Sequence, residues 1–515
     1  MSRTSNNESA DILRQMQLPI DPVEKQKLQD QLWQRASTDG TPLVEPQDNG
    51  NYQVTFLYRS SGNEEIELFC PDLHDRLLGE DGKPRKFERV PGTDTFILQL
   101  DNIPADTFSA YSIKKVGEKE PLQDEFSKKF PLYEYDIGKN ETKRKQSSYI
   151  QLPMAKKPDW ENMQPPSVIT RSIERKEYKD PTKTFADRDV FIYRPNNWID
   201  IPPADRKVIF MLDGEEFCKT LTPYIDAIRQ DEDNPFSNTA IVFVDSKMTK
   251  TPYEYSSFNH KPYEIPQDTV ISLPDRVYEY YFKKDDFVRM LAEDLIPTYK
   301  EDLGVENNDN VILAAHSLAA YPVLATAALE STEKIGGIIL MSPALNMKME
   351  VEFPAEPVGR LAETPIYIQI GQLEDTKPPR VDQEEKDMGD ETRLESVQRF
   401  HQYLAQNNYQ VEEELMPFPS GHSGMHAIDG LNNGLRFISE RQEKIHQERV
   451  ADKAASENVA TPAPENATEA ASNPPSTTAL LTSRAASGIL GTQKTEPRLD
   501  QQPNEPRIQT PRSKL

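Results

Sequence analysis

The sequence predicts an α/β fold, with a mostly parallel sheet covered by helices on both faces, preceded by a small all-β domain. From about residue 166 onward, short continuous apolar runs alternate with helical patterns, which is typical of buried parallel strands. Before residue 120, apolar residues alternate with polar ones, which is typical of half-buried antiparallel strands. The length of 515 residues exceeds what one hydrophobic core organises, so we expect two folded domains.

Composition and charge narrow the class of protein. The formal net charge of −25 disfavours a nucleic-acid partner, because a polyanion would be held against net repulsion. The two cysteines, Cys70 and Cys218, cannot form a disulfide framework, and apolar neighbours indicate buried thiols. The first residues lack an apolar signal region, and no apolar run reaches membrane-spanning length. We therefore expect a cytoplasmic protein without a membrane span or a cleavable export signal.

The N-terminal part combines a polar start, a helical pattern and alternating strands. Residues 1–20 are polar, and we expect them to be flexible. A helical pattern covers residues 21–35, with Pro22 suited to its first turn. It leads a β-sandwich domain at residues 21–120, whose strands are expected at residues 52–58, 66–70, 95–100 and 108–113. Such a module is typical of a spacer or a lid.

Residues 121–165 are charged and proline-rich, which suits an extended linker between domains. The second domain is expected at residues 166–440. Its apolar runs predict strands at residues 190–193, 208–212, 240–244, 311–314, 337–341 and 366–370. Helical patterns separate them at residues 221–229, 287–299, 318–330 and 393–405. The remaining tail, residues 441–515, is rich in Ala, Thr and Pro, and we expect it to be disordered.

The apolar run at residues 311–314 leads into a serine bracketed by small residues. Ser317 is flanked by Ala315, Ala319 and Ala320, the outline of a nucleophile elbow, in which small neighbours let a tight strand-to-helix turn expose the hydroxyl. The usual pattern has glycine where this chain has Ala315 and Ala319. Pro322 lies where a standard helix would need an amide donor, so we expect a distorted first turn.

An elbow serine needs a base and an orienting acid, in the chain order Ser, acid, His. Glu374 and Asp375 both follow the strand predicted at residues 366–370, so either can be the acid. After a strand-like stretch at 411–416, a turn presents His422, with His426 as its local rival. A third histidine, at position 316, is expected to point away from the serine, because adjacent side chains diverge at an elbow.

The oxyanion of an acyl-transfer reaction requires amide donors. The first donor is expected to be the Leu318 amide, directly after the serine. The second is expected from the loop after the strand at 208–212, where Gly214 lets the backbone turn inward, so the amide of Gly214 or Glu215 can serve. A plain turn at Asp213-Gly214 is the alternative. The sequence contains no metal-site or nucleotide motif, and no cofactor is expected.

In these residues the chain resembles the enterochelin esterase family over roughly residues 25 to 440. The matching segments are Trp33, Gly40 to Pro46, Val54 to Arg59, Gly92-Thr-Asp94, Leu212-Asp-Gly214, Arg276-Val-Tyr-Glu279, Glu293 to Pro297, the serine elbow, Gly371-Gln-Leu-Glu374 and Gly421-His422. The resemblance implies an α/β-hydrolase domain preceded by an immunoglobulin-like β-sandwich that caps the cleft. It favours Glu374 over Asp375 as the acid.

The family hydrolyses ester bonds of iron-loaded catecholate trilactone siderophores. The resemblance therefore implies a small-molecule ester substrate that carries iron, bound by Arg276 and Asp213. A guanidinium suits anionic catecholate oxygens, although Arg276 could instead pair with Glu279 at the surface. The chain departs from the family in its elbow alanines, in the absent tryptophan after Gly-His, and in Lys283-Lys284 where an asparagine is expected. These departures concern the natural substrate more than the reaction type.

Two functional classes follow. The first is a serine esterase acting through an acyl-serine intermediate, with Ser317, His422 and Glu374 as its catalytic residues. The second is a catalytically weak relative that binds a ligand or partner in the same cleft. Export through the polar C-terminal tail as an uncleaved signal is a further hypothesis. The terminal Ser513-Lys-Leu515 has the form of a peroxisomal address, which we treat as coincidental. Nothing in the sequence specifies an oligomeric state.

Overall fold

The structure is a computed structural model of the chain. It describes residues 8–79, 84–118, 120–156, 173–228, 234–246, 279–280, 283–329, 334–345, 361, 363–377 and 391–459. By contacts the chain divides into two units, residues 1–454 and 455–515. All the features described below belong to the first unit, apart from the last residues of helix α9.

A seven-stranded mixed sheet organises residues 173–454. Its order is β10-β11-β13-β12-β14-β15-β16, and the strands from β13 to β16 run parallel. The bounds are β10 Glu174–Tyr178, β11 Arg188–Tyr193, β12 Lys207–Leu212, β13 Thr239–Val244, β14 Val311–His316, β15 Gly337–Met341 and β16 Ile366–Gln369. The six predicted apolar runs are therefore strands, and β10 is an additional, antiparallel edge strand.

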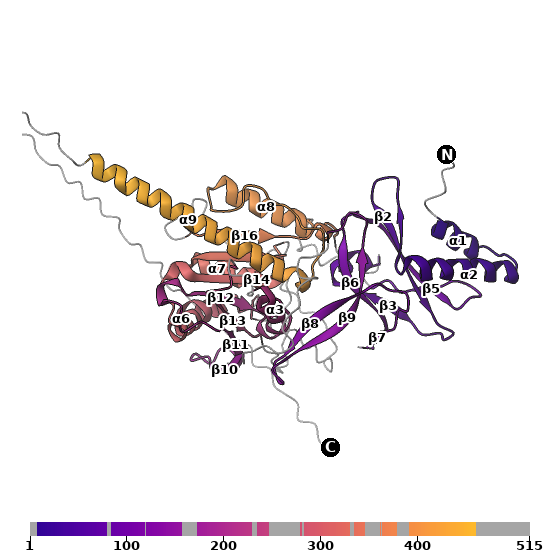
Figure 1. Cartoon of the computed structure of the whole chain (residues 1–515), viewed down its shortest axis with the longest axis horizontal. Helices are drawn as coiled ribbons and strands as arrows, with labels where there is room; N and C mark the ends of the chain where they lie inside the picture. The colour runs from indigo at the N-terminus through magenta and orange to yellow at the C-terminus, as the bar shows by residue number, and fades with distance from the viewer. Residues whose placement is uncertain are drawn as a thin grey trace, which may run out of the picture. The chain divides into compact units, whose positions relative to one another are not determined.

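Helices cover both faces of this sheet (Figure 1). Alternate residues of each strand point to opposite faces: Phe210 of β12 packs in one core cluster and Met211 in another. The first cluster contains residues of α5 Lys284–Arg289, η5 Met290–Leu295, α6 Ile296–Leu303, α7 Ala320–Ala328 and α8 Arg393–Gln406. The second contains residues of α3 Gly214–Ile228 and α9 Ala427–Val459. The predicted sheet with helices on both faces is thus observed.

The N-terminal part contains two smaller sheets and two helices. The first sheet has the order β1-β2-β5-β4, and the second has β3-β6-β9-β8 with β7 beside β6. The bounds are α1 Glu8–Gln17, α2 Pro22–Asp39, β1 Leu43–Pro46, β2 Tyr52–Arg59, β3 Ile66–Phe69, β4 Glu88–Arg89, β5 Thr95–Ile103, β6 Phe108–Lys115, β7 Pro121–Leu122, β8 Lys129–Asp136 and β9 Glu141–Gln151. Asp21 caps α2 by accepting the Val23 amide, with Pro22 in the first turn as predicted.

Three sequence predictions were wrong about order and local structure. Residues 8–17 of the segment expected to be flexible form α1, which buries Leu13 and Met16 against α2. The predicted linker contains the β8–β9 hairpin, whose charged residues pair across the strands while Phe130 and Tyr135 are buried. Helix α9 continues to Val459, so residues 441–459 of the tail are helical. Residues 460–515 lie outside the described residues.

The strand expected at residues 411–416 is also absent. Val411 and Phe418 make only isolated parallel bridges, to Ile366 and Gly371. The stretch between them contains three consecutive glutamates, of which Glu413 and Glu414 are exposed. A run of like charges at a sheet edge favours solvation over continuous pairing.

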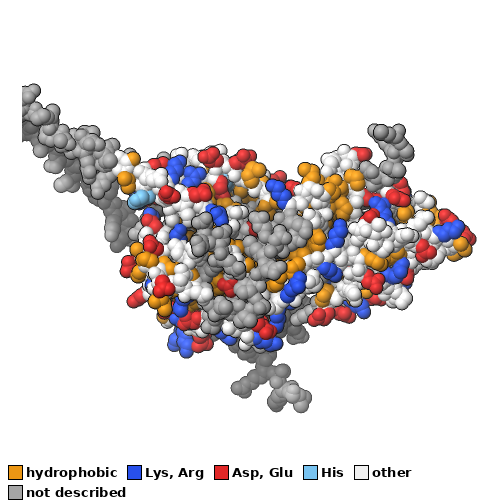
Figure 2. Space-filling model, viewed as in Figure 1, with side chains coloured by type: hydrophobic (Ala, Val, Ile, Leu, Met, Phe, Trp, Pro, Cys, Tyr) orange, Lys and Arg blue, Asp and Glu red, His pale blue; other side chains and the backbone are white. Residues whose placement is uncertain are grey.

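Surface charge, helix hydrophobicity and the grouping of metal-ligating side chains indicate which kinds of partner the described part of the chain could bind. On the face shown in Figure 2, acidic and basic side chains are interspersed over the described surface. None of the helices in the described ranges is long and apolar enough to cross a membrane. In those same ranges, no group of three or more His, Cys, Asp or Glu side chains is arranged to hold a metal ion.

Candidate active site

The predicted elbow is a sharp turn at the end of β14. Ser317 adopts a φ of 60°, in the left-handed region that residues other than glycine rarely enter. The chain then makes a single 3₁₀ turn, η7 Ser317–Ala319, before α7 begins at Ala320. Ala315 and Ala319 are fully buried on either side. The first turn after the serine is therefore tightened, as Pro322 predicted.

Ser317, His422 and Glu374 form a continuous hydrogen-bonded chain. The Oγ atom of Ser317 lies 2.8 Å from Nε2 of His422, and Nδ1 of the same ring lies 2.8 Å from Oε2 of Glu374. The glutamate side chain is 1% exposed and the histidine side chain 20% exposed. The three residues therefore have the relative placement of a nucleophile, a base and an orienting acid.

Backbone hydrogen bonds join the loop carrying the acid to the loop carrying the histidine. Phe418 donates its amide to Ile370, and Gln372 and Leu373 donate theirs to Phe418 and Ser420. Glu374 closes the short turn η9 Gln372–Glu374, where its Oε1 accepts the Gly371 amide at 3.1 Å. A Cβ atom on Gly371 would lie 2.4 Å from the carbonyl oxygen of Ser420, so this approach requires glycine.

The surroundings of Glu374 favour its charged form. Burial by itself raises the pKa of this carboxyl, but the hydrogen bond and charge of His422, the charge of Arg393 and a hydrogen bond from Ser342 together hold its pKa below the ordinary value. Arg393 Nη1 lies 3.7 Å from Oε2 of Glu374. Glu374 is therefore suited to hold the imidazole and to stabilise a positive charge on it.

The loop after β12 lies beside the elbow, because β12 and β14 are neighbouring parallel strands. Asp213 has a φ of 57°. A Cβ atom on Gly214 would lie 2.6 Å from the backbone at Phe243 and Val244, so only glycine fits there. The Glu215 amide donates to Oδ1 of Asp245 at 3.4 Å, and burial raises the pKa of Asp245 to about 6. Of the two predicted second donors, the amide of Glu215 is therefore already engaged by Asp245.

The alternative acid and base lie elsewhere. Asp375 binds Arg76 of the N-terminal part, with Nη2 at 2.8 and 3.0 Å from its two carboxylate oxygens. His426 is buried between Asp72 and Asp429, with nitrogens 4.0 and 3.7 Å from their carboxylates. The geometry thus selects Glu374 and His422 as the partners of the serine.

Other residues near the triad were not assigned by sequence reasoning, or were assigned differently. His316, which was expected to point away from the serine, packs its ring against His422, with ring centroids 4.9 Å apart, and against Phe217. Ser342 follows β15, the strand next to β16, so its place at the same sheet edge was a usable signal. For Arg393, at the start of α8, no local signal exists.

Arg276, predicted to bind substrate, lies outside the described residues. Its motif partner Glu279 is buried and forms a two-pronged ion pair with Arg188, at 2.8 and 3.1 Å. Glu279 is therefore not part of a surface pair. The next residue, Tyr280, places its hydroxyl 3.3 Å from Oδ1 of Asp213.

A cavity of about 570 Å³ opens beside the histidine of the triad. One wall consists of His316, His422, Asp213 and residues of α3. The other wall comes from β3, β6, β8 and β9 of the N-terminal part and includes Phe69, Ala110, Tyr111, Leu132 and Tyr133. Both parts of the chain therefore build the space next to the triad.

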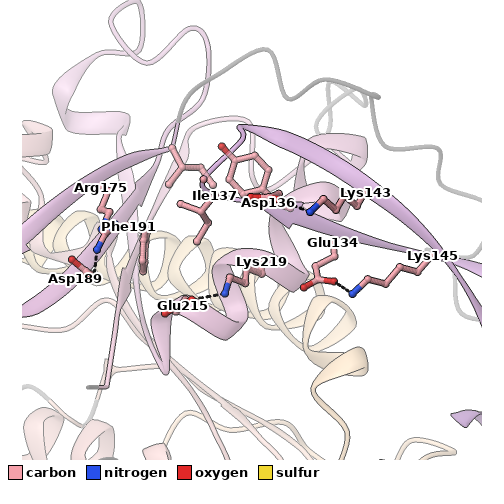
Figure 3. Close-up of a pocket in the computed structure, with 13 residues that line it drawn as sticks. Glu134, Asp136, Ile137, Lys143, Lys145, Arg175, Asp189, Phe191, Glu215 and Lys219 are labelled. Atoms are coloured by element: carbon pink, nitrogen blue, oxygen red, sulfur yellow. Dashed lines mark hydrogen bonds and ion pairs between the residues drawn. The ribbon is translucent and has the colours of Figure 1, made fainter. Parts of the chain in front are cut away.

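A second, more polar cavity of about 530 Å³ shares Glu134 and Lys145 with the first. Figure 3 shows that its basic side chains each face an acidic one: Lys143 with Asp136, Lys145 with Glu134, Lys219 with Glu215, and Arg175 with Asp189. Since each positive charge is matched by a negative one, these ion pairs give the lining no net charge for an anionic ligand.

The comparisons with known proteins point to one group of enzymes. No family model matches the chain. An iron(III) enterobactin esterase from Dickeya dadantii is 25% identical over 216 residues, which cover 38% of this chain and 49% of that protein. The chain therefore spans about half the length of this curated relative.

Two solved structures extend the likeness. The enterobactin esterase of Shigella flexneri, crystallised in the presence of enterobactin, matches 80% of this chain and 98% of its own at a TM-score of 0.51 and 15% identity. The ferric enterobactin esterase of Salmonella typhimurium matches with the same coverage, TM-score and identity. At this identity the likeness shows the fold. The resemblance to the enterochelin esterase family predicted from the motifs is confirmed, and the chain shares the α/β-hydrolase-type fold of these enzymes.

Proposed function

We propose that the chain is a serine esterase that hydrolyses carboxylic esters through an acyl-serine intermediate. The observation that carries this proposal is the unbroken hydrogen-bonded chain from the Ser317 hydroxyl through His422 to Glu374. The strained backbone of Ser317 supports it, since left-handed strain at a non-glycine residue is concentrated at functional turns. A protein that only binds ligands has no need for this alignment.

In the proposed reaction, Ser317 Oγ attacks the ester carbonyl carbon while Nε2 of His422 accepts the hydroxyl proton. The negative oxygen of the tetrahedral intermediate is held by the amides of Leu318 and Gly214. The intermediate expels the alkoxide, which takes the proton from His422 and leaves as an alcohol. Water then attacks the acyl-serine with His422 again as base, and the acid is released. Glu374 keeps the ring oriented and stabilises its cationic form throughout.

The proposed substrate is a ferric catecholate trilactone siderophore or a related ester. The similarity to enterobactin esterases supports it. In the cavity beside His422, the described charged residues are Glu134, Asp213, Glu216 and Lys145, so carboxylates outnumber cations. We propose that Arg276 supplies positive charge for the catecholate oxygens, and we retain it as a proposed substrate-binding residue, with Asp213 at the cavity wall. Iron enters only as part of the substrate, and the reaction requires no resident cofactor.

We further propose that the N-terminal sheets form an immunoglobulin-like sandwich that caps the cleft. Their side chains line half of the cavity beside His422, which supports a part in substrate recognition. In this arrangement the apolar side chains of β6 and β8 would contact the substrate group that extends away from the scissile bond.

The proposal is tested with the full chain and its Ser317→Ala variant. Wild-type protein should react with a fluorophosphonate probe at Ser317 and hydrolyse p-nitrophenyl butyrate, whereas the variant should do neither. Absence of labelling in folded wild-type protein would favour the alternative, a ligand-binding relative.

The substrate class needs a separate experiment. Iron-loaded and iron-free trilactone should be incubated with enzyme beside simple acyl esters, with products identified by mass spectrometry. Ring opening of the iron-loaded trilactone with a higher kcat/KM than for p-nitrophenyl butyrate supports the proposed substrate. Turnover of simple esters alone would retain the esterase and reject the siderophore. Arg276→Gln should then raise KM for the iron-loaded ester more than for the neutral ester, because only the former carries catecholate anions.

A further inference from the structure

We propose that the N-terminal part of the chain positions the catalytic acid and histidine. Asp72, Arg76 and Asp106 of that part, together with Leu373 of the loop that carries the acid, are then positioning residues for the reaction. This inference rests on the proposed function. It goes beyond a cap, because a cap acts on substrate, whereas these contacts act on the loops that carry Glu374 and His422.

The acid loop is held from the N-terminal part on both sides of Glu374. Leu373, the preceding residue, is 2% exposed and belongs to the same hydrophobic cluster as Leu73 and the inner residues of β2, β3 and β5. Asp375, the following residue, is bound by Arg76 through both carboxylate oxygens. A shift of the N-terminal part would therefore move the backbone of Glu374 directly.

A third contact reaches the start of the same turn. The side-chain amide of Gln372 donates to Oδ1 of Asp106 at 2.7 Å. Asp106 lies in the connection between β5 and β6. Three residues that flank Glu374, namely Gln372, Leu373 and Asp375, thus have their side-chain partners in the N-terminal part, while the Glu374 side chain remains directed at His422.

The histidine loop is held in the same way. Oδ1 of Asp72 accepts the amide of Gly421, the residue before His422, at 3.3 Å. The Ser420 hydroxyl donates to the Phe108 carbonyl at 3.4 Å. The contact is close: a Cβ atom on Gly421 would lie 1.9 Å from the carbonyl oxygen of Asp72. Glycine before the histidine is therefore required by the N-terminal part, not by a left-handed turn.

The carboxylate of Asp72 makes further contacts of its own. Its side chain is fully buried, and Oδ2 accepts the Ser109 hydroxyl at 2.6 Å. His426 lies on its other side, with Nε2 at 4.0 Å. Burial by itself lowers the pKa of His426, but the hydrogen bond to Asp429 and the charges of Asp72 and Asp429 together raise it above the ordinary value. A buried carboxylate that is hydrogen-bonded to both parts of the chain is suited to fix the position of the histidine loop relative to the N-terminal sheets.

Loosening the loops that carry Glu374 and His422 should affect kcat more than KM. Misplacing a catalytic group by about 1 Å costs about 100-fold in rate, because the reacting atoms leave hydrogen-bonding geometry. Loosening the loops should therefore lower the rate of each correctly folded active site. A purely structural role predicts something else, namely fewer folded molecules with unchanged turnover per site.

The experiment compares Asp72→Ala and Leu373→Ala with the control Glu45→Ala in the full chain. Glu45 is also a buried carboxylate of the N-terminal part, but it binds the amides of Ser9 and Ala10 and the Arg35 side chain, far along the chain from both loops. Active sites are counted by stoichiometric fluorophosphonate labelling, and kcat and KM for p-nitrophenyl butyrate are measured per labelled site.

We expect Asp72→Ala and Leu373→Ala to lower kcat per site about 10- to 100-fold, with KM within about threefold of wild type. Glu45→Ala should leave kcat per site within about twofold, even if its melting temperature falls. Asp72→Asn, which keeps an oxygen acceptor for Gly421, should recover most of the turnover lost in Asp72→Ala. Wild-type kcat per site in both Asp72→Ala and Leu373→Ala would overturn the inference. Failure of the proposed function would look different, since wild-type enzyme itself would then neither label nor turn over.

Discussion

The proposed nucleophile and its two hydrogen-bonded partners are held by different means. Ser317 directly follows β14, which pairs with β12 and β15 of the same sheet, and its 3₁₀ turn leads directly into α7. Glu374 and His422 lie on loops whose hydrogen bonds reach Asp72, Arg76 and Asp106, about 270 to 350 positions earlier in the chain. The difference teaches that Ser317 is placed by the sheet to which it is attached, whereas the proposed acid and base are placed by contacts between two separate parts of the chain.

The largest effect is expected at the locally placed residue. Ser317→Ala should lower kcat about 10⁴-fold or more, because the remaining groups cannot replace the nucleophile. The melting temperature should stay near that of wild type, since the substitution removes one hydroxyl at a site that the sheet already defines. Ester hydrolysis and thermal unfolding measured on the same preparation check both statements. Retained hydrolysis would place the nucleophile elsewhere.

The next effect distinguishes the two neighbouring carboxylates on the loop. Glu374→Gln should lower kcat about 10³- to 10⁴-fold, because the amide cannot stabilise the imidazolium and favours the wrong tautomer. Asp375→Asn is the matched control, one position further on, and removes only the charge that faces Arg76. It should cost about tenfold at most. Equal losses in steady-state kcat would contradict the assignment of Glu374 as the orienting acid.

A third substitution tests the contact between the two parts of the chain through stability. Gly421→Ala should destabilise the fold by about 3 kcal/mol, because its new methyl group would overlap the backbone of Asp72. Gly424→Ala, three residues later, is the control: its Cβ would meet only the Phe217 ring at 3.6 Å, an ordinary contact. Urea unfolding should separate the two variants. Similar midpoints would mean that the loop and Asp72 are not packed as described.

The smallest effect contrasts Glu374 with a second carboxylate near β16, the partly buried Glu412. Burial raises the pKa of Glu412 to about 7, and its Oε2 has no hydrogen-bond partner within the described part of the chain. A raised carboxyl pKa means that the folded state prefers the neutral form, so stability falls as pH rises from the unfolded pKa towards 7. Glu412→Gln should therefore stabilise the protein by about 2 kcal/mol at pH 8 and hardly at all at pH 4.5. Urea unfolding at the two pH values checks this, and an equal gain at both would contradict it.

Prediction from sequence succeeded where the signal is local. Strands β11 to β16 were predicted because each is a short apolar run buried on both faces. The elbow at Ser317 was predicted from small residues within three positions, and a distorted first turn was predicted from Pro322, which the structure shows as a 3₁₀ turn. The hairpin of β8 and β9 was mistaken for a linker, because a charged, proline-containing stretch has the same composition whether its charges face solvent or each other.

The sequence by itself determined the α/β sheet, the position of Ser317 and the order of serine, acid and histidine, because apolar periodicity and turn residues act over a few positions. The residues around position 374 left Glu374 and Asp375 open until the family resemblance favoured Glu374, and the tertiary structure shows that Glu374 faces His422 while His426 is buried between Asp72 and Asp429. Only the tertiary structure decided that Asp72 and Arg76 hold the two loops. Those choices depend on which surfaces meet when the N-terminal sheets pack beside the α/β sheet. No short stretch of sequence encodes such a meeting, because its energy comes from contacts between residues hundreds of positions apart.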